Sequence, residues 1–281
     1  MNAQDDTPTL DDFEWPQETT LWASNGSVDM SLQPDRVRAL GWEQNQKLAF
    51  WPVLDGRHIV WDVGPADSDD LRNAASLRMR TQAPPEHVDD SRVGQYENAY
   101  LRWPREFAVE RGLFEHADAG DATVRLSVSE RGNDDVQFLR AEPWPASMPW
   151  GVPAVATAAV QIGPFYKRAT DSQSGVGGQK TEIHLPREVV AELGLEASQP
   201  VAGRLTALGG ELALAFDVEV EETENAPYVR RLVGSTVHSE EYGSYESLKL
   251  RVSRPYAHAL GIAGETVALT VRDGVLVVER E

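Results

Sequence analysis

The stretch Lys180 to Glu219, KTEIHLPREVVAELGLEASQPVAGRLTALGGELALAFDVE, decides the fold that we expect for this chain. Ile183 and Leu185 alternate with polar residues, which is typical of a half-buried strand. Pro186 suits the start of a helix, because its fixed φ fits there and its missing N–H is not needed. Apolar residues then recur at helical spacing up to Gly194, which tolerates the positive φ of a helix end.

A hairpin follows this helix in the sequence. Two apolar-rich runs, 201–208 and 212–220, flank Gly209-Gly210, and such a glycine pair is a two-residue hairpin signal. The stretch therefore predicts a strand, a short helix and a hairpin, in that order.

The same pattern occurs four times, at residues 28–63, 99–142, 180–220 and 248–281. The first copy begins VDMSLQPDRVRALGW, the second AYLRWPREFAVERGLF and the fourth LKLRVSRPYAHALGI. We expect their helices to start near Pro34, Pro104, Pro186 and Arg254.

The four copies alternate between two types. GQYENAYLRWPR from Gly94 aligns without gaps on GSYESLKLRVSR from Gly243, which relates copies two and four. Copies one and three share the hairpin endings Trp61-Asp62-Val63 and Phe216-Asp217-Val218. The chain is therefore interpreted as an A-B unit that was duplicated to A-B-A′-B′.

The strand, Pro-initiated helix, glycine and hairpin of IHLPREVVAELGL and the following residues resemble the AbrB-like, or SpoVT-AbrB, swapped-hairpin family. The resemblance implies a mainly β fold with short helices, in which two copies interlock their hairpins into one small barrel. Copies one and two would form one barrel, and copies three and four another. One copy alone would be unstable, since isolated hairpins are marginal in water.

These repeats predict four parts of the chain. Residues 1–20 form an acidic N-terminal arm, 21–142 the first barrel, 143–178 an aromatic and proline-rich strap with a flexible linker, and 179–281 the second barrel. A short helix is expected at Leu71 to Thr81, within the long polar connection between the first two copies.

Composition excludes several classes of protein. The chain has 281 residues, which is enough for two domains, and no cysteine, which excludes disulfides and thiol chemistry. We expect a cytoplasmic protein with no membrane contact, because no apolar run reaches membrane-spanning length and no signal peptide pattern is seen.

The net charge of −19 is the most unusual bulk property, with 45 acidic residues against 26 basic ones. An acid-rich surface with few lysines resembles that of a protein from a very salty cytoplasm, where salt screens repulsion between the acids. The alternative is an ordinary acidic protein. In molar salt the acidic charge is a much weaker argument against binding nucleic acid.

Repeated basic residues are the candidate binding groups. Arginines at helix starts are disfavoured by the helix dipole, so their repetition favours a role in phosphate contact, although pairing with a neighbouring acid is the alternative. In DNA-binding relatives, basic residues near the first strand of the motif contact DNA. The predicted DNA-binding residues are Arg36, Arg102, Arg105, Lys180, Arg187, Lys249, Arg251 and Arg254.

No catalytic, metal or cofactor site is expected. The six histidines show no metal spacing, and SGVGGQKT at 174–181 fails as a phosphate-binding loop, since a strand rather than a helix follows it. The sequence therefore favours a transcriptional regulator or architectural factor that binds double-stranded DNA. The alternative is a scaffold on the same barrels that binds itself or another protein through its acidic surface.

The net charge generates a prediction about salt. If the charge reflects a halophilic cytoplasm, dilution into low salt unscreens repulsion between the acids, and the fold weakens. We expect the melting temperature to rise steadily from dilute buffer to molar potassium chloride. A melting temperature indifferent to salt contradicts the halophilic interpretation.

Overall fold

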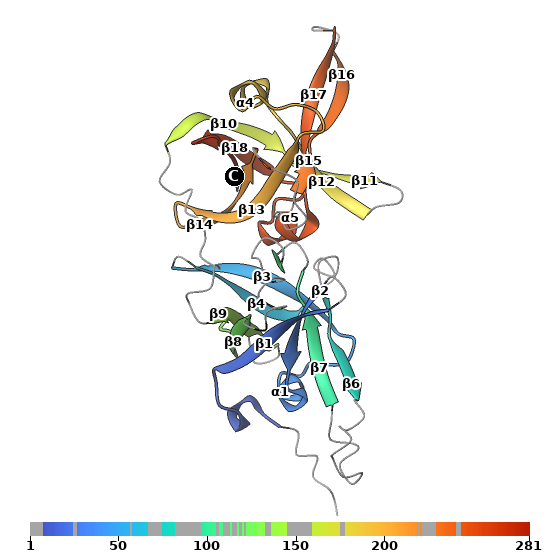
Figure 1. The fold of residues 1–281 in the computed structure, drawn as a ribbon, viewed down its shortest axis with the longest axis vertical. Helices are drawn as coiled ribbons and strands as arrows, with labels where there is room; N and C mark the ends of the chain where they lie inside the picture. The colour runs from blue at the N-terminus through green and yellow to red at the C-terminus, as the bar shows by residue number, and fades with distance from the viewer. Residues whose placement is uncertain are drawn as a thin grey trace, which may run out of the picture. The chain divides into compact units, whose positions relative to one another are not determined.

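The structure is a computed structural model, and the residues it describes are 8–24, 27–56, 58–66, 75–81, 97–104, 107–108, 113, 117, 120, 122–132, 136–144, 159–174, 178–218, 220, 229–239 and 243–281. The described chain is mainly β with short helices and curled sheets (Figure 1). Its Cα positions divide it into two compact units, the first drawn from residues 1–53, 59–108 and 112–150 and the second from 54–58, 109–111 and 151–281.

The first unit begins with a 3₁₀ turn, Leu10–Asp12, and then contains a single curled sheet. Its elements are β1 (Gln17–Ser24), β2 (Ser27–Leu32), α1 (Pro34–Ala39), β3 (Lys47–Asp55), β4 (His58–Pro65), β5 (Ala75–Ser76), β6 (Arg78–Thr81), β7 (Glu97–Arg102), β8 (Thr123–Val128) and β9 (Leu139–Trp144). The strand order is β5-β3-β4-β9-β8-β1-β2-β7-β6. The two ends of this order, β5 and β6, are separated in the chain by Leu77 alone.

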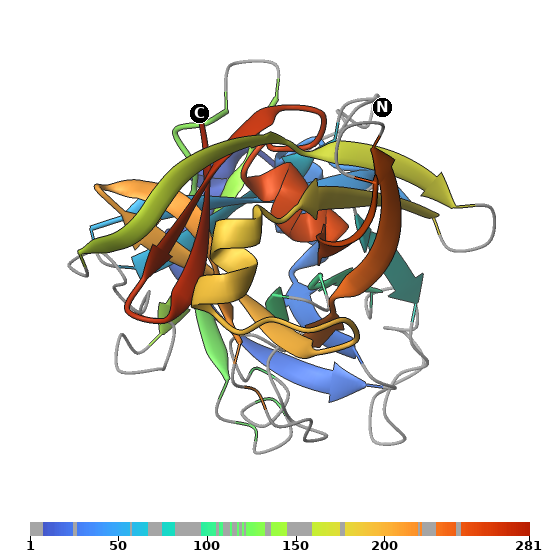
Figure 2. The same cartoon turned by 90° about the horizontal axis from the view of Figure 1, so that it is seen from above.

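The second unit repeats this arrangement over two sheets. Its elements are β10 (Val160–Arg168), β11 (Thr170–Ser174), β12 (Gly178–His184), α4 (Arg187–Glu192), β13 (Pro200–Leu208), β14 (Glu211–Asp217), β15 (Val229–Arg231), β16 (Val233–Ser239), β17 (Gly243–Val252), α5 (Arg254–Ala259), β18 (Thr266–Arg272) and β19 (Val275–Arg280). The orders are β10-β18-β19-β14-β13-β15 and β11-β12-β17-β16. Figure 2 shows the strong curvature of β10.

The two units have the same strand order, element by element. The single strand β1 corresponds to β10 and β11 together, and each later strand of the first unit has one counterpart in the second. In both units the first strands of the two copies pair with each other, β2 with β7 and β12 with β17. The hairpins of the two copies pair through their second strands, β4 with β9 and β14 with β19.

Each unit turns its sheet at two corners, and each corner holds a buried apolar residue. Leu21, Leu77 and Ala169 have no exposed surface, and Leu232 is 2% exposed. At two corners the backbone bonds are the same: Asn45 and Ser198 donate N–H to the carbonyls of Leu77 and Leu232, at 2.8 and 2.9 Å. Each corner strand therefore pairs one half with a neighbouring first strand and the other half with a hairpin.

The helices are those that the repeats predict. α1, α4 and α5 each span six residues, and the glycines that follow them, Gly41, Gly194 and Gly261, have φ between 58° and 68°. That left-handed conformation carries little steric cost in glycine. In the second copy Phe107 and Ala108 are helical, and the predicted helix start at Pro104 has no described helix boundary.

The connections differ from the sequence expectation. β1 begins at Gln17, inside the predicted arm. β5 and β6 lie within residues 75–81 of the helix expected at Leu71 to Thr81, whose residues 71–74 lie outside the described residues. β10 and β11 occupy residues 160–174 of the predicted strap and linker and hydrogen-bond to β18 and β12. Short segments with little periodicity become strands here because a neighbouring strand edge supplies their backbone partners.

The hairpin endings of copies one and three also align differently in space. Trp61 on β4 lies opposite Ala141 on β9, and Leu214 on β14 lies opposite Val278 on β19. The register therefore makes Leu214, and not Phe216, the residue equivalent to Trp61. Asp62 contacts Arg140 of the other hairpin at 3.1 Å, whereas Asp217 contacts Arg204 of its own hairpin at 2.9 Å. The shared WDV and FDV letters are therefore offset by two residues.

Corner residues provide a test of the two units. All eight tryptophans lie in residues 1–150, so tryptophan fluorescence reports on the first unit, whereas far-ultraviolet circular dichroism reports on both. We expect Leu77→Ala and Leu232→Ala each to cost about 2–5 kcal/mol of unfolding free energy through lost burial and cavity formation. Leu77→Ala should shift the fluorescence transition in urea, and Leu232→Ala only the dichroism transition. Equal fluorescence shifts would contradict independent units.

Candidate functional site

The predicted cations of the first strands meet acids from the partner copy. In the second unit, Glu182 on β12 lies directly opposite Arg251 on β17. Arg251 Nε donates to Glu182 Oε1 at 2.9 Å, and Lys249 Nζ lies 3.5 Å from Glu182 Oε2. The Glu182 side chain is only 10% exposed, so two of the predicted DNA-binding cations converge on one largely buried carboxylate.

These contacts determine the charge state of Glu182. Its burial alone would raise its pKa, but the hydrogen bond from Arg251 and the charges of Lys249 and Arg251 outweigh burial and hold the pKa below its ordinary 4.5. The carboxylate is therefore ionised at neutral pH and offsets one of its two cations.

The first unit contains the equivalent pair. Asp29 on β2 lies opposite Arg102 on β7, and Arg102 Nε lies 3.1 Å from Asp29 Oδ1. Asp29, which is not among the predicted binding residues, is therefore the partner of Arg102. The sequence does contain a signal for this pairing. Both A copies have an acid at the same motif position, Asp29 and Glu182, and both B copies have an arginine at the same motif position, Arg102 and Arg251.

The helix-start arginines have different surroundings. Arg36 lies over the rings of Phe13 and Trp15, 5.0 and 4.6 Å from their centroids, and donates to the carbonyl of Glu14 at 2.9 Å. Burial lowers the pKa of Arg36, against the charge of Glu14, which raises it. In contrast, Arg187 is exposed.

The remaining predicted residues are placed less completely. Arg254 is half-buried at the first position of α5. Arg105 lies outside the described residues, and Lys180 belongs to β12 but its side chain is not described. The structure therefore brings Arg102 to Asp29 and Lys249 with Arg251 to Glu182, and it does not gather all eight predicted residues into one described cluster.

Charge is unevenly distributed between the units. The first strands and corner strands of the second unit, β10–β12 and β15–β17, carry seven Lys or Arg and three Asp or Glu, a net charge of +4. The corresponding strands of the first unit, β1, β2 and β5–β7, carry three of each sign. Within a chain of net charge −19, the basic strands are concentrated in the second unit.

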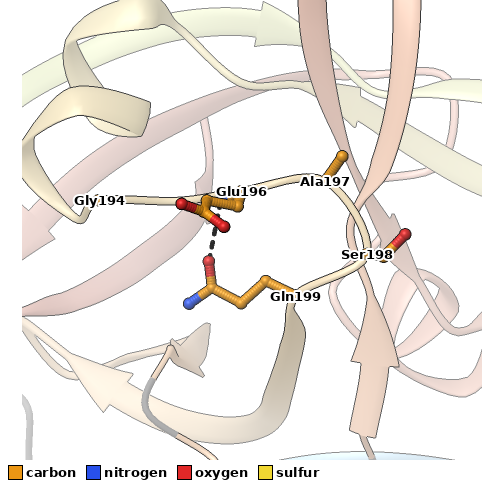
Figure 3. A pocket seen from close by; sticks show the side chains of 5 residues that line it. All are labelled: Gly194, Glu196, Ala197, Ser198 and Gln199. Atoms are coloured by element: carbon orange, nitrogen blue, oxygen red, sulfur yellow. Dashed lines mark hydrogen bonds between the residues drawn. The ribbon is translucent and has the colours of Figure 1, made fainter.

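The surface hollows among the described residues include the following two. One, of about 420 Å³, lies in the loop from Gly194 to Gln199 (Figure 3). The amide of Gln199 is already used there, since its Oε1 accepts from the N–H of Glu196 at 2.9 Å and its Nε2 donates to Val218 O at 3.0 Å. The Gln199 amide therefore holds this loop together, and it is not available to a ligand in the hollow.

The second hollow, of about 530 Å³, lies at a corner of the first unit. It is lined by Glu18, Thr19, Thr20, Trp22, Ser31 and Thr123. Trp22 packs edge-on against Tyr100 beside it, with ring centroids 5.7 Å apart. Its lining is mostly polar and carries one charged side chain.

Within the described ranges, no three His, Asp or Glu side chains are grouped to hold a metal ion, and no helix is long and apolar enough to cross a membrane. Comparison of the chain with family models, curated proteins and solved structures found no match.

The Glu182 pair generates a prediction about acid stability. A carboxylate with a lowered folded pKa stabilises the fold above its unfolded value, here 4.5, and loses that contribution as pH falls through its folded pKa. We expect the urea unfolding free energy of the wild type to fall more steeply below about pH 4.5 than that of Glu182→Gln. Glu188→Gln, an exposed acid on α4, is the control, and parallel curves for wild type and Glu182→Gln would refute the assignment.

Proposed function

We propose that each unit is an AbrB-like swapped-hairpin barrel. Three features support the proposal: the first strands of two copies pair, their hairpins pair through their second strands, and the two end strands of the order are separated in the chain by a single residue. The second unit satisfies the same three conditions through β12 with β17, β14 with β19, and β15 followed by β16. Such an arrangement needs two copies to complete one core.

On these barrels the chain acts as a DNA-binding regulator or architectural factor, and its second unit makes the DNA contact. The observation that carries this proposal is the net charge of +4 on the first and corner strands of that unit, within a chain of −19. Lysine and arginine bind phosphate oxygens irrespective of sequence, which gives affinity and register on the duplex. Molar salt screens the repulsion between DNA and the remaining acids.

The first unit favours a different role. Its corresponding strands have no net charge, Arg102 is paired with Asp29, and Arg36 is covered by Phe13 and Trp15. These contacts support a protein-interaction role for this unit, in which the barrel serves as a scaffold. A chain with one DNA-binding unit and one interaction unit accommodates both functions that the sequence suggests.

Binding to a random-sequence duplex tests the DNA proposal. Fluorescence anisotropy with the full chain is measured over a range of potassium chloride in which the protein is folded. We expect Lys180→Gln with Arg187→Gln to weaken binding and to reduce the slope of log K against log salt by about one for each lost contact. Arg187 is exposed, and removal of a cation from a helix start should not weaken the helix, so the fold should be preserved.

The matched control removes the same charges from the first unit. Lys47→Gln with Arg38→Gln also replaces one lysine and one arginine, both exposed. We expect this control to bind DNA like the wild type. Absence of wild-type binding at every salt concentration would overturn the DNA proposal, and equal weakening by both double variants would overturn the assignment to the second unit.

A further inference from the structure

The positions that line the hollow of the first unit have equivalents in the second unit, which strand register locates. Thr20 lies opposite Thr123 on β8, and Arg168 lies opposite Thr266 on β18, within the matching sequences ATVRLSV and ETVALTV. Ser31 lies opposite Tyr100, and His184 lies opposite Lys249. Strand register therefore assigns equivalent positions in the second unit to the lining of the hollow.

The residues at these positions differ in charge. In the second unit, Lys167, Arg168, His184 and Lys249 stand where the first unit has Thr19, Thr20, Ser31 and Tyr100. Four neutral positions have thus become three permanent cations and one histidine. Tyr166, which replaces Glu18, also removes the one acid of the lining.

Contacts within the second unit place Lys167, His184 and Lys249 near one another, whereas Arg168, the next residue along β10, faces the other side of the strand. β10, which carries Lys167 and Arg168, contacts β12, which carries His184. His184 Nδ1 lies 3.1 Å from Ser247 Oγ, which fixes the orientation of the imidazole ring. In the first unit, Thr19 and Ser31 occupy the positions of Lys167 and His184. The Thr19 hydroxyl donates to Ser31 O at 2.9 Å, so these two positions are neighbours in both units.

The electrostatic state of His184 reflects this neighbourhood. Burial and the cations Lys249 and Lys167 lower its pKa below the ordinary 6.5, against Glu182, which raises it. His184 is therefore mainly neutral at pH 7. Arg251 is the other charged side chain bonded to Glu182 on this face.

We propose that Lys167, His184 and Lys249 form a phosphate-binding site at the β10–β11 corner, which takes a phosphodiester of the DNA backbone. The proposal rests on the proposed DNA-binding function and adds Lys167, which the motif itself does not contain, since β10 precedes the repeat. Lys167, Lys249 and Arg251 together exceed the single charge of Glu182, so the corner carries an excess of positive charge that an anion can offset. The two ammonium groups bind phosphate oxygens as point charges.

The site makes DNA binding dependent on pH. A bound phosphate raises the pKa of His184, because it offsets the repulsion from Lys167 and Lys249. Protons are then taken up on binding, so affinity rises as pH falls through the interval between the bound and the free pKa values. One histidine changes the affinity by at most about tenfold per pH unit in that interval.

The experiment measures duplex affinity of the full chain between pH 8 and pH 5.5, using the same random-sequence DNA. We expect wild-type binding to tighten toward the lower pH. His184→Gln should remove most of that dependence, whereas Lys167→Gln should weaken binding several-fold at every pH and reduce the salt slope by about one. The matched control is Lys47→Gln, at an exposed lysine of the first unit. It should change neither the affinity for DNA nor its pH dependence.

A second measurement separates this site from the DNA-binding function. His184→Gln identifies the His184 ring signal among the six histidines in a proton NMR spectrum. We expect inorganic phosphate to raise the pKa of His184 in the wild type, and to raise it less in Lys167→Gln. If phosphate raises the pKa of His184 but the protein binds no DNA, the anion site stands and DNA is ruled out as its ligand. If the protein binds DNA, and Lys167→Gln and His184→Gln both bind it as Lys47→Gln does, the proposed site is wrong and the DNA-binding function stands.

Discussion

Four buried corners are the features on which the rest of the fold depends. At Leu21, Leu77, Ala169 and Leu232 a strand segment leaves one partner and joins another, and the corner side chain enters the core. One half of each corner strand pairs with a first strand, and the other half pairs with a hairpin of the partner copy. A single copy would leave these backbone groups and its apolar hairpin face unpaired, which explains why copies occur in twos.

The acid–arginine pairs lie at the boundary between two copies. Asp29 with Arg102 and Glu182 with Arg251 both join first strands from different copies. Cross-strand and surface ion pairs contribute only about 0.2–1 kcal/mol, so their main consequence is to specify which residues face each other. These pairs also explain why a count of repeated arginines overstates the positive charge available to a ligand.

The two units share their topology and differ in the side chains of one face. Register fixes the correspondence, and at equivalent positions the first unit has threonine, serine and tyrosine where the second has lysine and histidine. Such a difference costs the fold little, since the inward side chains that form the core are kept apolar in both units. Division of labour between the units is therefore compatible with one conserved packing scheme.

The helices and the repeats could be predicted because their signals are local. Pro34 at the start of α1, Gly194 after α4 and the Gly209-Gly210 turn each fix a few backbone dihedrals within the same segment. The likeness of copies two and four also follows from residue identity alone, in GQYENAYLRWPR and GSYESLKLRVSR. Mainly β structure with short helices was accordingly predicted before any pairing was known.

Only the tertiary structure decided the corner strands and the partners of the charged residues. β5 and β11 span two and five residues, too few for a periodic pattern, and become strands because distant segments supply hydrogen-bond partners. The opposition of Glu182 to Arg251, and the nearness of Lys167 to His184, depend on the register between segments that are far apart in the chain. Register is set by packing of the whole sheet, so the sequence determined which charges are present and the fold determined where they meet.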